Sequence, residues 1–263
     1  MTVRPLDLGP PESIHLEESP LTLVVAQIRH EHLAAALDSR RVIDIHEYVA
    51  DFLGELKEVE EHSLQVSPQI GRGVAMSAGA PTRSWQIRGK DSWVATLSPE
   101  AFSLETRAYQ SWTHFRGRLE QLCAGVMKIL SPQVLSRVGL RYIDEIAVEE
   151  VEAPGDWVGR IDSAYLGPVR HPEVGASVMK SEQIIEFLAP NDVRVRLRHG
   201  SLLAEDETPV YLLDHDVFAQ PGSRLTMVDL FERLDSMHSI AVALFHQSLD
   251  RDFLVSLRGG DAP

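Results

Sequence analysis

Three arginines alternate with apolar residues in the stretch VRVRLRH, residues 193–199. Successive side chains of a β-strand point to opposite faces, so this alternation predicts a strand with Arg194, Arg196 and Arg198 on one face. Guanidinium groups bind carboxylates and phosphates through two parallel hydrogen bonds. The arginine row therefore suits either recognition of a small anionic ligand or pairing with acidic side chains of the same sheet.

Charged residues alternate in the same way in two other predicted strands. RVGLRYIDEI contains Arg137 and Arg141 with Gly139 between them, and YLLDHDVF contains Asp214 and Asp216. If these strands share a sheet with the arginine row, one face of that sheet is charged and the other is apolar. The candidate ligand-binding residues are Arg141, Arg194, Arg196, Arg198, Asp214 and Asp216.

Two interpretations of this charged face remain open. In one, unpaired arginines grip a carboxylate, a phosphate or a nucleotide. In the other, the face is solvated and its charges pair with one another, each exposed pair contributing only ~0.2–1 kcal/mol. The near-equal supply of arginines and carboxylates favours the second interpretation.

A metal site is a further possibility around Asp214-His215-Asp216, because carboxylates with a histidine suit Mn, Fe or Zn. Alternation points His215 away from both aspartates, and His238 falls beside the apolar stripe of its predicted helix. We therefore expect His238 to be a hydrogen-bonded core histidine, and we predict no metal and no other cofactor.

Acid–base chemistry could use Asp235 with His238, or one of His114, His199 and His246. The sequence contains no G-x-S-x-G, no H-E-x-x-H and no phosphate-binding glycine motif of the right spacing. These absences favour a binding protein over an enzyme, and an enzyme or sensor for a small anionic ligand stays open as the alternative.

The charge of the chain bears on its partners. The 39 acidic residues exceed the 25 lysines and arginines, which gives a formal net charge of −14. Such a field repels nucleic acid and anionic membranes and attracts a basic protein. No apolar run approaches the roughly 20 residues that span a bilayer. The single cysteine, Cys123, excludes an internal disulfide and suits a reducing cytoplasm.

The pattern of apolar residues predicts the elements that position these groups. Spacings of three and four predict three long amphipathic helices, over 41–61, 109–130 and 225–249, the last capped by Thr226 with Asp229. Strands are predicted over 21–30, 63–77 (interrupted by Pro68 and by Gly71 and Gly73), 84–98 as a hairpin, 101–108, 135–151, 181–189, 193–199 and 209–218.

These elements predict an α+β fold with a mostly antiparallel sheet, because the strands follow one another through short connections. Each half runs through several strands into a long helix, which suggests two pseudo-repeated β-β-β-α halves. The expected organisation is a tail at 1–20, a first half at 21–151, a connector at 152–180, a second half at 181–254 and a tail at 255–263.

Five stretches together resemble an uncharacterised prokaryotic family that occurs sporadically among bacteria and archaea. They are FSLETRAYQSW (102–112), RVGLRYIDEI (137–146), LRHG (197–200), YLLDHDVF (211–218) and LDSMH (234–238). The resemblance implies no activity and no site residues. Its scattered occurrence is typical of mobile or defence-associated genes. We therefore expect a bacterial cytoplasmic protein that binds a basic partner, such as a cognate toxin or a defence effector.

Overall fold

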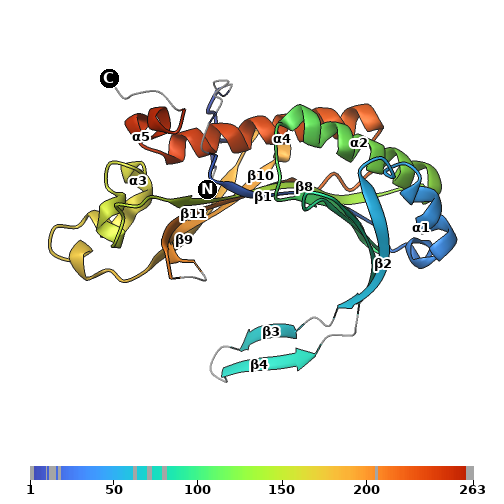
Figure 1. The fold of residues 1–263 in the computed structure, drawn as a ribbon, viewed down its shortest axis with the longest axis horizontal. Coiled ribbons are helices and arrows are strands. Elements are labelled where there is room, and N and C mark those ends of the chain that lie inside the picture. Colours follow the sequence, from blue (N-terminus) through green and yellow to red (C-terminus); the bar gives the residue numbers. More distant parts are fainter. Residues whose placement is uncertain are drawn as a thin grey trace.

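The backbone is organised around one antiparallel sheet of nine strands (Figure 1). The structure is a computed structural model, and it describes residues 3–9, 11, 16, 19–61, 64–69, 73–78, 82–204 and 207–258. The strand order across the sheet is β2-β5-β6-β7-β1-β8-β11-β10-β9. The strand bounds are β1 Leu21–His30, β2 Leu53–Glu61, β5 Thr82–Gly89, β6 Val94–Ser98, β7 Ala101–Thr106, β8 Leu135–Ala147, β9 Ser181–Leu188, β10 Arg194–Leu203 and β11 Pro209–Ala219.

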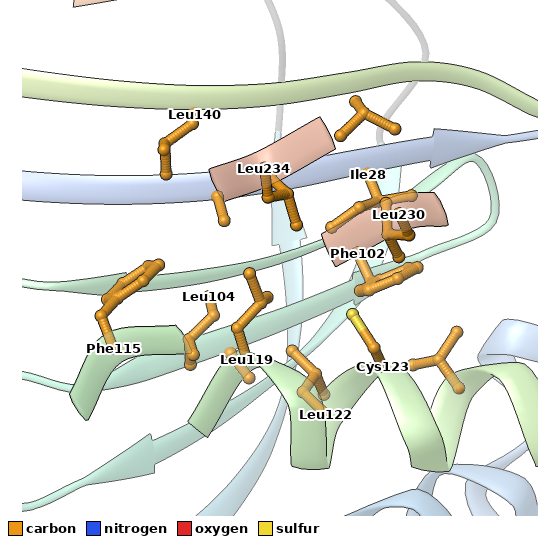
Figure 2. Close-up of a cluster of buried hydrophobic side chains, with 14 of the residues drawn as sticks. Ile28, Phe102, Leu104, Phe115, Leu119, Leu122, Cys123, Leu140, Leu230 and Leu234 are labelled. Carbon is orange, nitrogen blue, oxygen red and sulfur yellow. The ribbon is translucent and has the colours of Figure 1, made fainter. Parts of the chain in front are cut away.

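Two long helices, α2 (Trp112–Ile129) and α4 (Met227–Ser248), lie on the same face of the sheet (Figure 1). We call this the helix face. Apolar side chains from both helices and from the central strands fill the space between them (Figure 2). The other face, called here the open face, is covered by none of the described helices. One sheet face is thus buried and the other is available for polar side chains, as antiparallel sheets allow.

Shorter elements complete the fold. They are α1 (Ser39–His46), α3 (Ser163–Leu166), α5 (Arg251–Ser256) and several 3-10 turns, of which three lie between β8 and β9. The strands β3 (Leu64–Gln69) and β4 (Gly73–Ala78) pair with each other as a separate two-stranded sheet, apart from the main sheet in Figure 1. None of the described helices combines the length and the apolar character needed to cross a membrane.

The predicted α+β class with an antiparallel sheet is confirmed. The helices expected at 109–130 and 225–249 form α2 and α4, and the hairpin expected at 84–98 forms β5 and β6. The capping box is present, since the Thr226 hydroxyl accepts from the Asp229 backbone N–H at 3.1 Å. The strand expected at 63–77 is the β3–β4 pair. The interruption expected at Pro68 is wrong, because Pro68 lies within β3 opposite Val74, and Gly73 begins β4, while Gly71 lies outside the described residues.

The prediction of three long helices is wrong, because the expected helix over 41–61 ends at His46. Its second part is the edge strand β2, which pairs with β5 from Leu53 opposite Gly89 to Glu61 opposite Thr82. A shift of register after Leu53 interrupts the two-residue alternation of this strand. Leu53, Leu56 and Val59 keep a spacing of three that imitates a helix, although Leu56 and Val59 point to opposite faces of the strand. Sheet hydrogen bonds decide the conformation.

Candidate functional site

The arginine row of β10 lies on the open face. The intervening Val195 and Leu197 are completely buried on the helix face, whereas Arg194 and Arg196 are exposed. In the sheet register, Arg196 lies between Asp216 of β11 and Glu186 of β9. Strand pairing thus brings β8, β11, β10 and β9 together and places their charged side chains on one surface.

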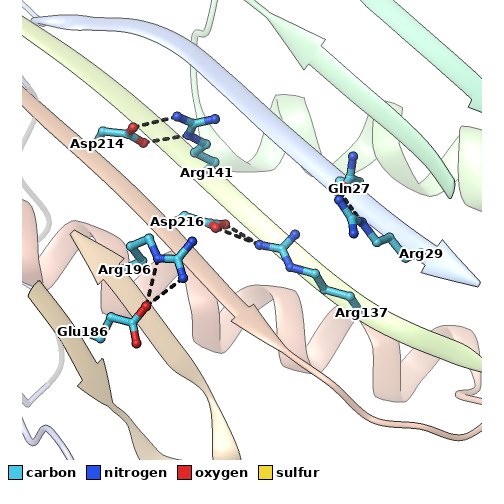
Figure 3. Close-up of polar contacts among 8 residues, drawn as sticks. All are labelled: Gln27, Arg29, Arg137, Arg141, Glu186, Arg196, Asp214 and Asp216. Carbon is cyan, nitrogen blue, oxygen red and sulfur yellow. Dashed lines mark hydrogen bonds and ion pairs between the residues drawn. The ribbon is translucent and has the colours of Figure 1, made fainter. Parts of the chain in front are cut away.

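The two aspartates of β11 are held by the arginines of β8 (Figure 3). Arg141 donates from Nε and Nη2 to the two carboxylate oxygens of Asp214, at 2.7 and 2.6 Å. Arg137 donates from Nη2 to both oxygens of Asp216, at 2.6 and 2.8 Å. Each aspartate therefore carries two charge-assisted hydrogen bonds, the stronger kind in proteins.

The arginines of β10 pair with β9 in turn. Arg196 donates from Nε and Nη2 to Oε1 of Glu186, at 2.9 and 2.7 Å, and Arg198 donates from Nε to Oε1 of Glu182 at 2.5 Å. Among the described residues, Arg194 has no ion-pair partner. Of the four predicted arginines, three are thus engaged by carboxylates and one is available to an external anion.

Gly139 gives Arg137 the space to reach its aspartate. A side chain at position 139 would begin 2.3 Å from Nη1 of Arg137, so the guanidinium lies where a larger residue would stand. The same guanidinium lies over the ring of Phe218, 4.6 Å from its centroid. The glycine between the two arginines of β8 therefore lets Arg137 lie flat against the sheet.

Burial distinguishes the pairs from one another. The Asp214 side chain is only 6% exposed, while its partner Arg141 is 46% exposed. The hydrogen bond with Asp214 is the main reason that the pKa of Arg141 is raised above its usual value. An anionic ligand would have to displace Asp214 in order to bind Arg141. The paired part of the open face is therefore a surface whose positive and negative charges neutralise each other.

The Asp214-His215-Asp216 group considered for metal binding is not brought together, whereas three of the candidate histidines, His215, His238 and His246, line one cavity on the helix face. His215 lies buried on the helix face, away from Asp214 and Asp216. Among the described residues, no group of three or more His, Cys, Asp or Glu side chains is arranged to hold a metal ion. Asp235 accepts hydrogen bonds from Trp112 Nε1 and Arg116 Nε, at 2.8 and 3.0 Å.

The candidate histidines differ in their immediate contacts. His238 is hydrogen-bonded as expected, with Nδ1 2.8 Å from the Tyr142 hydroxyl, and its ring stacks on Trp112 at 4.7 Å between centroids. His199 Nδ1 lies 3.0 Å from the Tyr211 hydroxyl. His114 and His246 meet the rings of Trp93 and Phe245 edge-on.

Sequence reasoning missed one buried acid, Asp144, on the helix face of β8. The signal for it was available, because Asp144 continues the apolar series of Val138, Leu140 and Tyr142. A carboxyl group at a core position of a strand is unusual enough to mark a site.

In comparisons with known proteins, neither the family models nor the curated proteins gave a match to this chain.

Proposed function

We propose that the chain is a non-enzymatic binding protein of the bacterial cytoplasm that engages a basic protein partner, such as a cognate toxin or a defence effector. The observation that carries this proposal is the internal pairing of Arg141, Arg196 and Arg198 on the open face. The positive charges of these arginines are already neutralised by carboxylates of the protein, so they are not free to bind an anionic substrate or ligand.

The pairing also indicates where the net charge acts. Each arginine–carboxylate pair is neutral, so the pairs contribute nothing to the net charge of −14. The excess of acidic residues must therefore act from the rest of the surface. A field of this sign steers a cationic partner and raises its association rate, most strongly at low ionic strength.

A tagged pull-down from the native host tests this proposal. We expect a basic protein to be captured at low salt and to be lost as the salt concentration rises beyond the range where surface charges act. Recovery of no partner, or of a partner whose binding is independent of salt, would contradict the proposal.

The second candidate function is recognition of a small anion, a phosphate or a nucleotide, on the open face. It is favoured by Arg194, which has no ion-pair partner among the described residues and lies two positions from Arg196 on the same face. Phosphate and nucleotides should then raise the melting temperature of the protein by mass action. The Arg194→Ala variant should lose this response but still capture the basic protein, which separates the two candidates.

We also infer that the two halves of the sheet derive from one duplicated unit. The strand order supports this, because β5-β6-β7-β1 on one side of the sheet mirrors β9-β10-β11-β8 on the other. In each set, three consecutive antiparallel strands lead into a long helix, α2 or α4, on the same face. Superposition of residues 21–129 on residues 135–248 tests the inference, which fails if the strands and helices do not overlap.

A further inference from the structure

A cavity of about 740 Å³ lies on the helix face, away from the arginine pairs. Strands β8 and β11 form its floor with Tyr142, Asp144 and His215. Helix α4 and the residues that lead into α2 form its walls, with the aromatic side chains of Tyr109 and Trp112 among them. Four of the five stretches singled out in the sequence contribute to this one cavity, although they are far apart along the chain.

One buried side chain in this cavity, His215, has no hydrogen-bond partner among the described residues. Its imidazole is completely buried, and neither ring nitrogen is hydrogen-bonded. Beside it lies the Asp144 side chain, 7% exposed, with Oδ2 4.0 Å from Nδ1 of His215, beyond hydrogen-bonding distance. Buried polar groups are nearly always hydrogen-bonded, so an unsatisfied imidazole beside a largely buried carboxyl group indicates a place for a ligand.

Burial of Asp144 and His215 determines their protonation states. Desolvation raises the pKa of Asp144 to about 8, and the negative charge of Asp214 adds to the effect. Desolvation lowers the pKa of His215 to about 4, so its imidazole is neutral at pH 7 and can accept a hydrogen bond. No lysine or arginine is among the described residues that line the cavity, so none of them offers a cation to balance a charge on Asp144.

We propose that this cavity binds a small organic cation that carries an ammonium group, with the Asp144 carboxylate as its counter-ion and His215 as a hydrogen-bond acceptor. The site is separate from the protein partner proposed above and from the open face.

The chemistry of the lining supports an ammonium group over the alternatives. An ammonium group donates up to three hydrogen bonds, and Asp144 and His215 supply acceptors side by side. The faces of aromatic rings attract cations, and Tyr109, Trp112 and Tyr142 line the same space. Leu21, Ala241 and Val242 suit an apolar body attached to the ammonium group. Among the described lining residues, an anion would meet an acidic group and neither a lysine nor an arginine.

Three probes of similar size and different charge test this proposal. They are 2-phenylethylammonium, 3-phenylpropanoate and 2-phenylethanol, each titrated up to about 10 mM, which detects a Kd near 1 mM. We expect only the ammonium probe to raise the melting temperature of the protein. An equal response to all three probes, or no response to the ammonium probe, would overturn the proposal.

The variant Asp144→Asn removes the counter-ion and keeps the shape of the side chain. We expect it to weaken binding of 2-phenylethylammonium by roughly 10- to 100-fold, as expected for a lost charge-assisted hydrogen bond. The matched control is Glu145→Gln, which makes the same change one residue away at an exposed position on the open face. Unchanged binding in Asp144→Asn, with the circular dichroism spectrum of the wild type, would refute the role of Asp144.

If Asp144→Asn does not fold, calorimetry on the wild-type protein can still test the role of Asp144. Binding of an ammonium group at pH 7 should ionise Asp144 and release up to one proton, which calorimetry in buffers of different ionisation enthalpy detects. Among the described residues, the titratable groups that line the cavity with Asp144 are Tyr142, Tyr109, His215, His238 and His246, with Asp214 on the opposite face. Binding that neither releases a proton nor weakens as the pH falls from about 9 to about 4 would contradict the assignment of Asp144 as counter-ion.

Discussion

Arg141 and Asp214 form a two-bond ion pair across strands β8 and β11, and the carboxylate is far more buried than the guanidinium. Arg196 makes two hydrogen bonds to Glu186 as well, but both of these side chains are more than half exposed, at 53% and 63%. The two pairs thus have the same chemical groups and differ in burial, so comparing them isolates the effect of burial on the contribution of an ion pair to stability.

We expect Arg141→Met to destabilise the protein by about 2 kcal/mol. The substitution leaves the Asp214 carboxylate buried without its partner, and the partial exposure of Arg141 keeps the cost below that of a fully buried pair. Arg196→Met should cost less than about 1 kcal/mol, as exposed pairs do. Urea denaturation of both variants measures the difference, and equal losses would show that burial does not decide the contribution.

Two glycines should lose different amounts of stability on substitution by alanine. At Gly200, where φ is +153°, a Cβ would lie 1.9 Å from the backbone oxygen of Ser181, so β9 and β10 would have to separate. We expect Gly200→Ala to cost about 3 kcal/mol or more. At Gly139 the nearest atoms belong to the flexible end of Arg137, which can move aside.

For Gly139→Ala we therefore expect a loss near 1 kcal/mol, mainly from weakened pairing of Arg137 with Asp216. Thermal denaturation compares the two variants, because a domain of this size loses roughly 2–4 °C for each kcal/mol. A larger loss at Gly139 than at Gly200 would contradict the close approach of β9 to β10.

The buried Asp144 should make stability depend on pH. Its pKa is about 8 in the folded protein, above the ordinary value near 4 of the unfolded chain. The folded state then holds a proton that the unfolded state releases, so this group lowers stability progressively as pH rises from about 4 to about 8. Asp144→Asn should be more stable than the wild type at pH 8.5 and should match it near pH 4.

Chemical denaturation at several pH values between 4 and 9 measures this difference. Glu145→Gln serves as the control, because the Glu145 side chain is exposed. A constant difference between Asp144→Asn and the wild type over this range would show that Asp144 ionises normally in the folded protein.

The direction of the arginines of β10 was predictable from alternation alone, since each lies two residues from the next. Their partners were not predictable. Glu182 and Glu186 face Arg198 and Arg196 only because β9 pairs with β10 in one particular register. The sequence pattern of β2 failed for a related reason, because its pairing with β5, including the shift of register after Leu53, is not visible in the sequence.

The cavity was beyond sequence reasoning because no single element contains it. Asp144 and His215 belong to different strands, and Trp112 precedes them by a whole helix and its following loop. Asp144 breaks the apolar series of its strand, but His215 and Trp112 are ordinary in their own segments. Only the packing of α2 and α4 over β8 and β11 places an acid, an imidazole and aromatic rings around one space.

The place of β1 has a consequence for how the chain reaches its native state. β1 is the first strand to be synthesised, yet it is the fifth of nine in the sheet, and its neighbours β7 and β8 begin at Ala101 and Leu135. More than 100 residues must be translated after β1 before both of its neighbouring strands exist, and until then its apolar side chains lack their native partners. Pairing between strands far apart in sequence slows folding and prolongs the exposure of aggregation-prone apolar surface. The nascent chain should therefore depend on chaperones until β8 has emerged.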